Sequence, residues 1–283
     1  MRFILVATVL VGAVTVSLNA SAGTSSKESN ASQSQDERCF AHADMPPDIR
    51  IASCTAVIAS GHFTGIELAA ALSNRAAAYN DKRQFDRALP DLDQAIGLDP
   101  GNGKAFHNRA LSYLVLGRPD KALTDYNVAI RLDPADEGNM INRGYIYAHM
   151  GEFDKALTDF STAITTNPNN RLGYSNRCYY RAVLNRFEEA LADCNQALSL
   201  APNAPDALDG RGLAYLKMKN YGGAIADYTA SIAADPHDPE PLYARGVAKL
   251  ARGDASGHDD VAAAKSMQAN IAETLASYGV EKH

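Results

Sequence analysis

The amino-acid sequence predicts an all-α array of stacked helical hairpins, because several residue types recur with a period of 34 residues. Prolines mark the period most clearly, at Pro100, Pro134, Pro168, Pro202 and Pro236. An alanine recurs in the same phase, at Ala88, Ala122, Ala156, Ala190 and Ala224. Self-similarity at a period of this length is typical of repeat proteins whose units bury their apolar faces against their neighbours. We therefore predict five full repeats, at 69–102, 103–136, 137–170, 171–204 and 205–238.

Residues 1–22 have the features of a signal peptide. Arg2 precedes an apolar run from Phe3 to Val16, and Ala20-Ser21-Ala22 has the small-x-small form that signal peptidase accepts. Cleavage before Gly23 would export the mature chain, so we expect a periplasmic or secreted protein. A retained anchor is the alternative, but the apolar run is shorter than the ~20 residues of a spanning helix. We expect no stable membrane insertion of the mature chain.

Two segments separate the signal peptide from the repeats. Residues 23–38 are rich in Ser, Asn and Gln and cannot bury enough apolar surface to offset their ordering entropy, which predicts a flexible linker. Residues 39–68 are expected to form a helical half-repeat that caps the array, because Pro46-Pro47-Asp48 marks a helix start. Repeat arrays need such end units, since an exposed repeat face is apolar.

Each repeat contains the signals of two helices, and the second repeat serves as the example. Its first helix carries Ala110 and Tyr113 and is expected to end near Gly117. Pro119 suits the first turn of the second helix, where a missing backbone N–H costs nothing. Asp133-Pro134 stops that helix, because a residue before proline is disfavoured in the helical region.

The C-terminal part, 239–283, begins as a sixth repeat with Tyr243, Arg245 and Gly246 but loses the pattern at 253–257. We expect a degenerate sixth repeat followed by capping helices at about 258–267 and 269–278. These helices would close the apolar end of the array.

The repeat pattern resembles that of the tetratricopeptide repeat (TPR) family. The family's small, aromatic, alanine and proline positions are occupied in the third repeat by Gly144, Tyr147, Ala156, Phe160, Ala163 and Pro168. The resemblance covers 69–238, and the chain as a whole resembles exported bacterial TPR proteins. It implies a right-handed helical solenoid of about five full repeats, a degenerate sixth and helical caps. It also implies a protein-binding scaffold rather than an enzyme. The fourth repeat departs from the pattern, with Cys178 and Cys194 at the small and aromatic positions and Arg181 in place of a tyrosine.

A periodic arginine and a periodic aspartate 16 residues later indicate an ion pair within each hairpin. Residues equidistant from the turn of an antiparallel hairpin lie side by side. The predicted structural pairs are Arg75–Asp91, Arg109–Asp125, Arg143–Asp159, Arg177–Asp193 and Arg211–Asp227. Pairing between neighbouring repeats, such as Arg109 with Asp91, is the alternative arrangement. Arginines that bind an acidic ligand are the alternative role.

The four cysteines are expected to form two disulfides if the compartment is oxidising. Cys178 and Cys194 have the same 16-residue separation as the ion pairs and should therefore face each other. Cys39 lies just before the helix that carries Cys54 and can be tied to it. The alternative is that the cysteines are buried free thiols.

Composition and motifs exclude several function classes. The formal net charge of −6 argues against a nucleic-acid partner, which needs clustered Lys and Arg. The sequence contains no nucleophile elbow, P-loop, zinc-protease or dinucleotide-binding motif. The seven histidines show no metal-ligand spacing. We therefore predict no catalytic residue, no metal and no cofactor.

The expected binding surface is the concave groove that TPR proteins line with their first helices. By this resemblance, the groove residues are Asn74, His107, Asn108, Leu111, Ile141, Asn142, Tyr145, Asn176, Tyr179 and Leu213. The asparagines could hydrogen-bond a peptide backbone or, alternatively, neighbouring turns or water. The mildly apolar lining favours a protein or peptide partner with apolar side chains. A cell-envelope glycan polymer and a part in an envelope enzyme are the alternatives.

Overall fold

The computed structural model describes residues 35–40 and 45–282. The predicted signal peptide and residues 23–34 of the predicted linker lie outside these ranges. The last four residues of that linker, 35–38, belong to helix α2 (Gln35–Phe40) and are therefore not part of a linker. Composition alone did not indicate this helix, which is anchored through the disulfide of Cys39 described below.

The described part of the chain contains fifteen helices and no strand, in agreement with the all-α prediction. The helices are α2 (Gln35–Phe40), α3 (Pro47–Ser60), α4 (Gly65–Asp81), α5 (Phe85–Leu98), α6 (Gly103–Val115), α7 (Pro119–Leu132), α8 (Glu137–His149), α9 (Phe153–Thr166), α10 (Arg171–Val183), α11 (Phe187–Leu200), α12 (Pro205–Lys217), α13 (Tyr221–Ala234), α14 (Pro239–Ala251), α15 (Gly257–Met267) and α16 (Ile271–Ser277).

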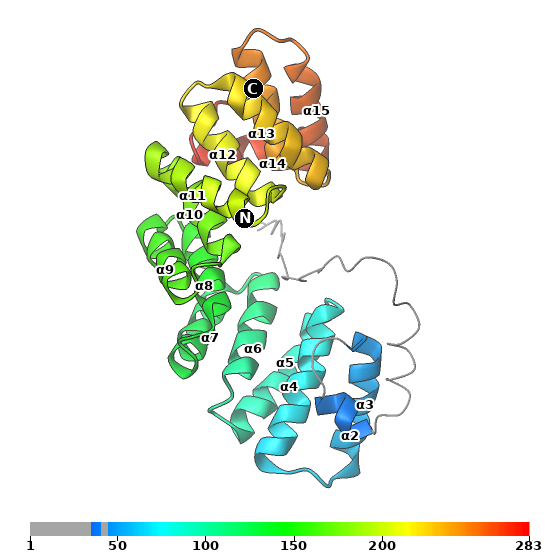
Figure 1. Cartoon of the computed structure of the whole chain (residues 1–283). Coiled ribbons are helices and arrows are strands. Elements are labelled where there is room, and N and C mark those ends of the chain that lie inside the picture. Colours follow the sequence, from blue (N-terminus) through cyan, green and yellow to red (C-terminus); the bar gives the residue numbers. More distant parts are fainter. Residues whose placement is uncertain (1–34, 41–44, 283) are drawn as a thin grey trace, which may run out of the picture. The chain divides into compact units, whose positions relative to one another are not determined.

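Consecutive helices pack together as hairpins (Figure 1). Helix α4 packs on α5, α6 on α7, α10 on α11, α12 on α13, and α14 on α15. The second helices of the five repeats begin at Phe85, Pro119, Phe153, Phe187 and Tyr221. The 34-residue period of the sequence is therefore also the period of the structure.

Local signals set the ends of these helices. The side chain of Asn102 accepts a hydrogen bond from the backbone N–H of Ala105 at the start of α6, and Asn170 does the same for Gly173 of α10. Such caps satisfy backbone donors that have no partner within the helix. Helix α3 ends at Gly61, whose φ of 68° is a left-handed conformation that glycine adopts without strain.

The chain divides into two compact units, Met1–Asn139 and Met140–His283. In the first unit, Leu72, Tyr79 and Leu92 form a core together with small alanines. In the second unit, a continuous core extends from the Cys178–Cys194 pair to Val280. Each unit thus has apolar contacts of its own.

Small residues let the two helices of a hairpin approach until an aromatic ring fills the space. A Cβ atom on Gly144 would lie 2.7 Å from a ring carbon of Phe160, and one on Gly212 would lie 2.7 Å from a ring carbon of Tyr228. Both distances are shorter than packed atoms allow. The alternating small and aromatic positions of the sequence are therefore contacts inside the hairpins.

The sixth repeat keeps the hairpin although its sequence departs from the pattern. A Cβ on Gly246 of α14 would lie 2.8 Å from the backbone oxygen of Gly257 at the start of α15, so the two helices are in close approach. Arg245 pairs with Asp260 at a separation of 15 residues, one fewer than in the other repeats. The connection between α14 and α15, residues 252–256, is longer than the three-residue connections of the other hairpins, and the pair still forms because Asp260 lies nearer the start of its helix than Asp227 does.

None of the helices in residues 35–40 and 45–282 combines the length and apolar character needed to span a membrane.

Candidate functional site

Each of the six hairpins contains a bidentate ion pair between its two helices. The arginine Nε and Nη2 atoms donate to the two carboxylate oxygens over 2.7–2.8 Å. The pairs are Arg75–Asp91, Arg109–Asp125, Arg143–Asp159, Arg177–Asp193, Arg211–Asp227 and Arg245–Asp260. The aspartate side chains are only 4–11% exposed. Pairing is therefore within the hairpin, and the alternative of Arg109 with Asp91 is not the one adopted.

The third guanidinium nitrogen, Nη1, reaches a polar atom on the preceding second helix. Arg109 contacts Asp93 at 2.8 Å, Arg177 contacts Ser161 at 3.1 Å, Arg211 contacts Asn195 at 3.0 Å, and Arg245 contacts Thr229 at 3.4 Å. Each of these arginines thus joins its own hairpin to the one before it. Sequence reasoning missed this second contact, although its acceptors are also spaced by multiples of 34 residues. Three of the five N–H donors of each guanidinium are thus engaged inside the protein, which favours the structural role over the binding of an acidic ligand.

The structure contains both expected disulfides. Cys39–Cys54 joins α2 to α3, and Cys178–Cys194 joins α10 to α11. The second bridge occupies the position of the small and aromatic pair in the other repeats. Gly210 of α12 packs on it, because a Cβ there would lie 3.1 Å from Cys178 Sγ.

In the first unit, the predicted groove residues contact other parts of the same chain. The side-chain amide of Asn74 donates to the backbone oxygen of Cys39 at 3.0 Å. Nδ1 of His107 lies 2.8 Å from Oδ1 of Asn139. The other predicted groove residues of this unit, both half-buried, are Asn108 and Leu111. The Asn74 contact matches the alternative in which these amides bind neighbouring segments.

In the second unit, the predicted groove residues differ in accessibility. Leu213 is 2% exposed and belongs to the core, and Ile141 is also buried. Asn176 donates to the backbone oxygen of Leu172, one turn earlier in its own helix. The half-buried members that remain are Asn142, Tyr145 and Tyr179. The two tyrosines are the ones that approach further polar groups.

A polar and aromatic cluster lies on the first helices of this unit. We define the first-helix cluster as Tyr179 of α10, Asp209 of α12, Asp238 and Glu240 at the start of α14, and Tyr278 after α16. The Tyr179 hydroxyl donates to Oε2 of Glu240 at 3.4 Å. The rings of Tyr179 and Tyr278 meet edge-on with their centroids 5.8 Å apart. All five side chains are half-buried, so the cluster is shielded from much of the solvent but remains reachable.

Burial and neighbouring carboxylates raise the pKa values of the acidic side chains in the first-helix cluster. Burial raises the pKa of Asp209 well above its ordinary value, and the charges that add to this effect are the carboxylates of Asp238, Glu240 and Asp206. Burial, assisted by Asp238, raises the pKa of Glu240 to about 7. Burial and, to a lesser extent, the charge of Glu240 also raise the pKa of Tyr145 on α8, whose ring meets that of His149 edge-on at 4.2 Å between centroids.

The end of the chain forms one side of the first-helix cluster. Helix α16 contacts α14 and α15, as expected of a capping helix. Beyond it, Nζ of Lys217 donates to the backbone oxygens of Tyr278 at 3.1 Å and Val183 at 2.6 Å, which ties the tail to α10 and α12. Val280 is 4% exposed and belongs to the core. The tail therefore covers part of the first helices as well as the end of the array.

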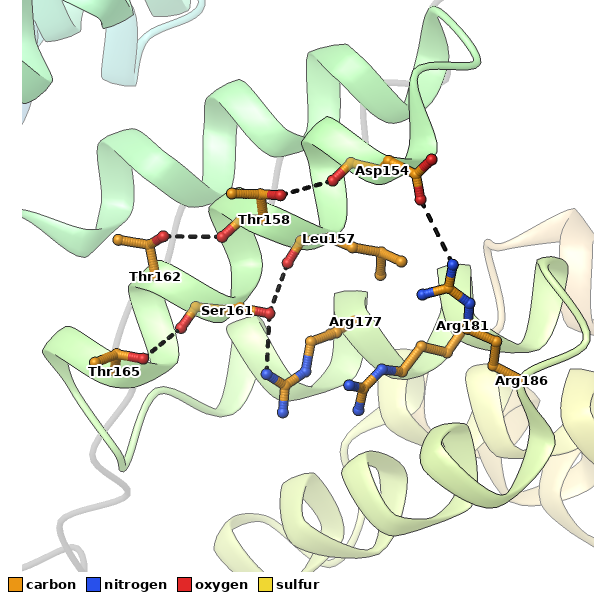
Figure 2. Close-up of a pocket in the computed structure, with 9 residues that line it drawn as sticks. All are labelled: Asp154, Leu157, Thr158, Ser161, Thr162, Thr165, Arg177, Arg181 and Arg186. Atoms are coloured by element: carbon orange, nitrogen blue, oxygen red, sulfur yellow. Dashed lines mark hydrogen bonds and ion pairs between the residues drawn. The ribbon is translucent and has the colours of Figure 1, made fainter.

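A separate hollow of about 530 Å³ lies between α9 and α10 and is bordered by Arg186, just before α11 (Figure 2). Four hydroxyl groups line it along α9, and each donates to a backbone oxygen one turn earlier: Thr158, Ser161, Thr162 and Thr165. On the facing side, Arg177 and Arg181 both bind Asp193, and Arg181 also binds Glu189. Because these donors and charges already have partners, the first-helix cluster is the stronger candidate site.

Within the described ranges, no group of three or more His, Cys, Asp or Glu side chains is arranged to hold a metal ion. The first-helix cluster offers carboxylates and phenols, which can form hydrogen bonds with a ligand.

The stacked hairpins and the surface built by their first helices define a helical-repeat protein. In this class, successive units combine into extended surfaces that bind other molecules. Sequence profiles described as "Tetratricopeptide repeat" match residues 69–137, 140–170 and 210–257. The chain belongs to the tetratricopeptide repeat family, as its sequence pattern predicted. Among curated proteins, no sequence matches it.

Solved structures share the fold. A tetratricopeptide repeat protein from Parabacteroides merdae aligns over 82% of this chain and 92% of its own, with 22% identity and a TM-score of 0.64. PilW, described as a type IV pilus biogenesis factor, aligns over 74% and 97% with 19% identity and a TM-score of 0.62. YrrB, described as a TPR protein with an unusual peptide-binding site, aligns over 68% and 97% with 20% identity and a TM-score of 0.54. At these identities the likeness concerns the fold.

Proposed function

We propose that this protein is a non-catalytic scaffold that binds a protein or peptide partner on the first helices of its second unit. The observation that carries the proposal is the first-helix cluster, in which Tyr179 contacts both Glu240 at the start of α14 and Tyr278 after α16, residues from distant parts of the sequence. Clefted or half-buried groups with strongly perturbed pKa values mark functional sites more often than ordinary surface charges do. The TPR fold supports protein–protein interaction as the general role.

A peptide is the simplest partner for this surface. YrrB is described as a TPR protein with an unusual peptide-binding site, which supports peptide binding as an activity of the shared fold. First helices of successive repeats present side chains at a regular spacing, so an extended or helical segment can meet several of them at once. The tyrosines add large, rigid contact areas of the kind that dominate binding energy at interfaces.

The test is binding of a random nonapeptide library to the immobilised protein and to a Tyr145→Ala/Tyr179→Ala variant. We expect selected peptides to bind the unchanged protein and to lose about tenfold or more in affinity with the variant. The matched control is Thr158→Ala/Thr162→Ala, which alters the hollow of Figure 2 and should leave binding unchanged. Retention on isolated cell wall without any peptide binding would support the glycan alternative in place of this proposal.

We also propose that the mature protein functions in the periplasm or outside the cell. The signal-peptide pattern of residues 1–22 and the two disulfides support an oxidising compartment. N-terminal sequencing of the protein from an extracytoplasmic fraction should give Gly23 as the first residue. A chain that keeps Met1 and stays with the cytoplasmic fraction would contradict export.

A further inference from the structure

The tail after α16, residues 278–282, folds back onto first helices that lie far from it in the sequence. The ring of Tyr278 meets the ring of Tyr179 on α10 edge-on, with 5.8 Å between the centroids. The backbone oxygen of Tyr278 accepts a hydrogen bond from Nζ of Lys217 on α12 at 3.1 Å. The tail therefore lies on the same first helices that we propose as the binding surface.

Val280 gives the tail an apolar anchor. Its side chain is 4% exposed and belongs to the core of the second unit, against which Tyr179 and Tyr278 also pack. Gly279 has a φ of 87°, a left-handed conformation that glycine adopts without strain. A Cβ on Gly279 would lie 3.1 Å from Nζ of Lys217, so the backbone passes close to that side chain. The segment thus combines an aromatic ring, a close backbone contact and a buried aliphatic side chain.

Closing the end of the array does not require these tail contacts. Helix α16 already covers α14 and α15, and its Ile271, Ala272 and Leu275 are buried. Helix α10 belongs to the fourth repeat, two repeats before the one that α16 covers. Among the described residues of the tail, Val280 alone is buried. The tail can therefore leave the first helices while α16 keeps its own core contacts.

We propose that the tail occupies the partner's place on the first helices and that the partner peptide binds by displacing it. This inference rests on the proposed function and names the chemistry of the partner segment, an aromatic side chain followed two residues later by an aliphatic one. The aromatic ring would pack on Tyr179, and its backbone oxygen would accept from Lys217. The aliphatic side chain would fill the space of Val280. Because tail and partner exclude each other, the docked tail lowers the apparent affinity for the partner.

The first measurement is the affinity of a fluorescein-labelled nonapeptide selected from the random library described under the proposed function. Val280→Asp places a charge where burial is nearly complete, so the tail should leave its site. The affinity should then rise about tenfold if the tail is docked about nine-tenths of the time. Ser277→Asp is the matched control, because it adds the same charge at an exposed position and should leave the affinity unchanged.

The outcomes separate this inference from the proposed function. An equal or lower affinity of Val280→Asp would overturn displacement of the tail while leaving peptide binding intact. Failure of every peptide to bind either protein would overturn both.

The second measurement needs no substitution. The backbone N–H groups of Gly279 and Val280 donate to backbone oxygens of α16 at 3.1 and 3.0 Å. In the complex with the probe, we expect their amide exchange to become faster while exchange around Tyr179 becomes slower. A tail that keeps its protection in the complex would overturn the inference.

The sequences of the selected peptides test the chemistry assigned to the partner. An aromatic residue followed two positions later by Val, Ile or Leu should be enriched about tenfold over the starting library. A selected set without this enrichment would overturn the assignment.

Discussion

The repeat arginines show how one side chain can hold two hairpins. Nε and Nη2 bind the aspartate of the same hairpin, and Nη1 of Arg109, Arg177 or Arg211 reaches the preceding second helix. A well-packed apolar pair could replace the ion pair at little or no cost in stability. An apolar pair could not make the hydrogen bond from Nη1 to the preceding second helix. We therefore infer that the arginine fixes how neighbouring repeats stack.

Removal of one partner should expose the cost of burying the other charge. Asp159→Ala leaves the guanidinium of Arg143 half-buried without its carboxylate, and we expect the free energy of unfolding to fall by about 3–5 kcal/mol. Chemical denaturation measures this change. Glu152→Ala removes the exposed ion pair with Lys155 at the start of the second helix of the same hairpin, and should have a much smaller effect because solvent screens that pair. Equal effects of the two substitutions would show that the Arg143–Asp159 pair is not a buried structural contact.

Glu240 should make stability depend on pH in a defined direction. Its pKa is about 7 in the folded protein, where burial disfavours the charged form, and about 4.3 in an unfolded chain. Between these values the folded state binds a proton that the unfolded state does not, so this group favours folding as the pH falls from about 7 to about 4.5. Above about pH 7 the buried charge opposes folding.

Glu240→Gln removes the buried negative charge that opposes folding at high pH. The variant should exceed the unchanged protein in free energy of unfolding by roughly 1–3 kcal/mol at pH 8, and the gain should disappear near pH 4.5. The groups that face Glu240 from the other elements remain in place: Asp209, Tyr145, Tyr179 and Tyr278, with Asp238 on its own helix end. A gain that is absent at pH 8, or equal at both pH values, would mean that the carboxylate is not held in a desolvated position.

At the scale of helices, the Cys178–Cys194 disulfide occupies the two positions where other repeats pack a small residue of the first helix on a large residue of the second. In the first repeat these positions hold Ala76 and Leu92, both fully buried. The double substitution Cys178→Ala/Cys194→Leu therefore supplies the packing of the first repeat and removes only the covalent link.

Without reductant, the unchanged protein should be more stable than this double variant by up to about 3 kcal/mol, because a loop of this length is closed in its unfolded state. With reductant, the difference in midpoint of denaturation should vanish. Alkylation of all four cysteines in the unreduced, unfolded protein would show that neither disulfide forms.

The tail after α16 is held by a hydrogen bond from Lys217 and by the buried side chain of Val280. Lys217→Met removes the donor to the Tyr278 backbone but leaves the core contacts of Ile271 and Leu275, which are 0% and 2% exposed. Amide exchange should therefore become faster after Ser277 and remain slow in the first turns of α16. Lys219→Met, at an exposed neighbouring position, should leave the exchange of the tail unchanged. Unchanged protection in both variants would mean that Lys217 does not hold the tail.

For the whole molecule, the hairpins could be predicted because their signals are local and repeated. Each proline that ends a second helix has counterparts 34 residues away, so the repeats support one another's assignment. Helix α2 shows the limit of this reasoning, since its polar composition resembles a linker and its anchor is the disulfide from Cys39 to Cys54. No period could have indicated that contact.

The candidate site was less predictable for a physical reason. Asp209, Glu240 and Tyr278 occupy different positions in different repeats or in the tail, so they share no sequence register. Glu240 and Tyr278 meet at Tyr179 because separate repeats stack and the tail packs back on them. Tyr179 was predicted because it takes a regular first-helix position of the family, and Asp209 shares the register of the predicted residues His107 and Ile141. Sequence periodicity thus indicates the surface on which a site can form but not the residues that converge there.

The account's central claim is that a partner peptide binds at the first-helix cluster, and amide exchange of the complex tests it most directly. The probe is a nonapeptide selected from the random library described under the proposed function. We predict slower exchange in α10, α12 and α14 around Tyr179, Asp209 and Glu240 when the peptide is bound, and no change around the hollow of Figure 2. Slower exchange in α9 and α11 alone, with the first helices unaffected, would contradict the claim.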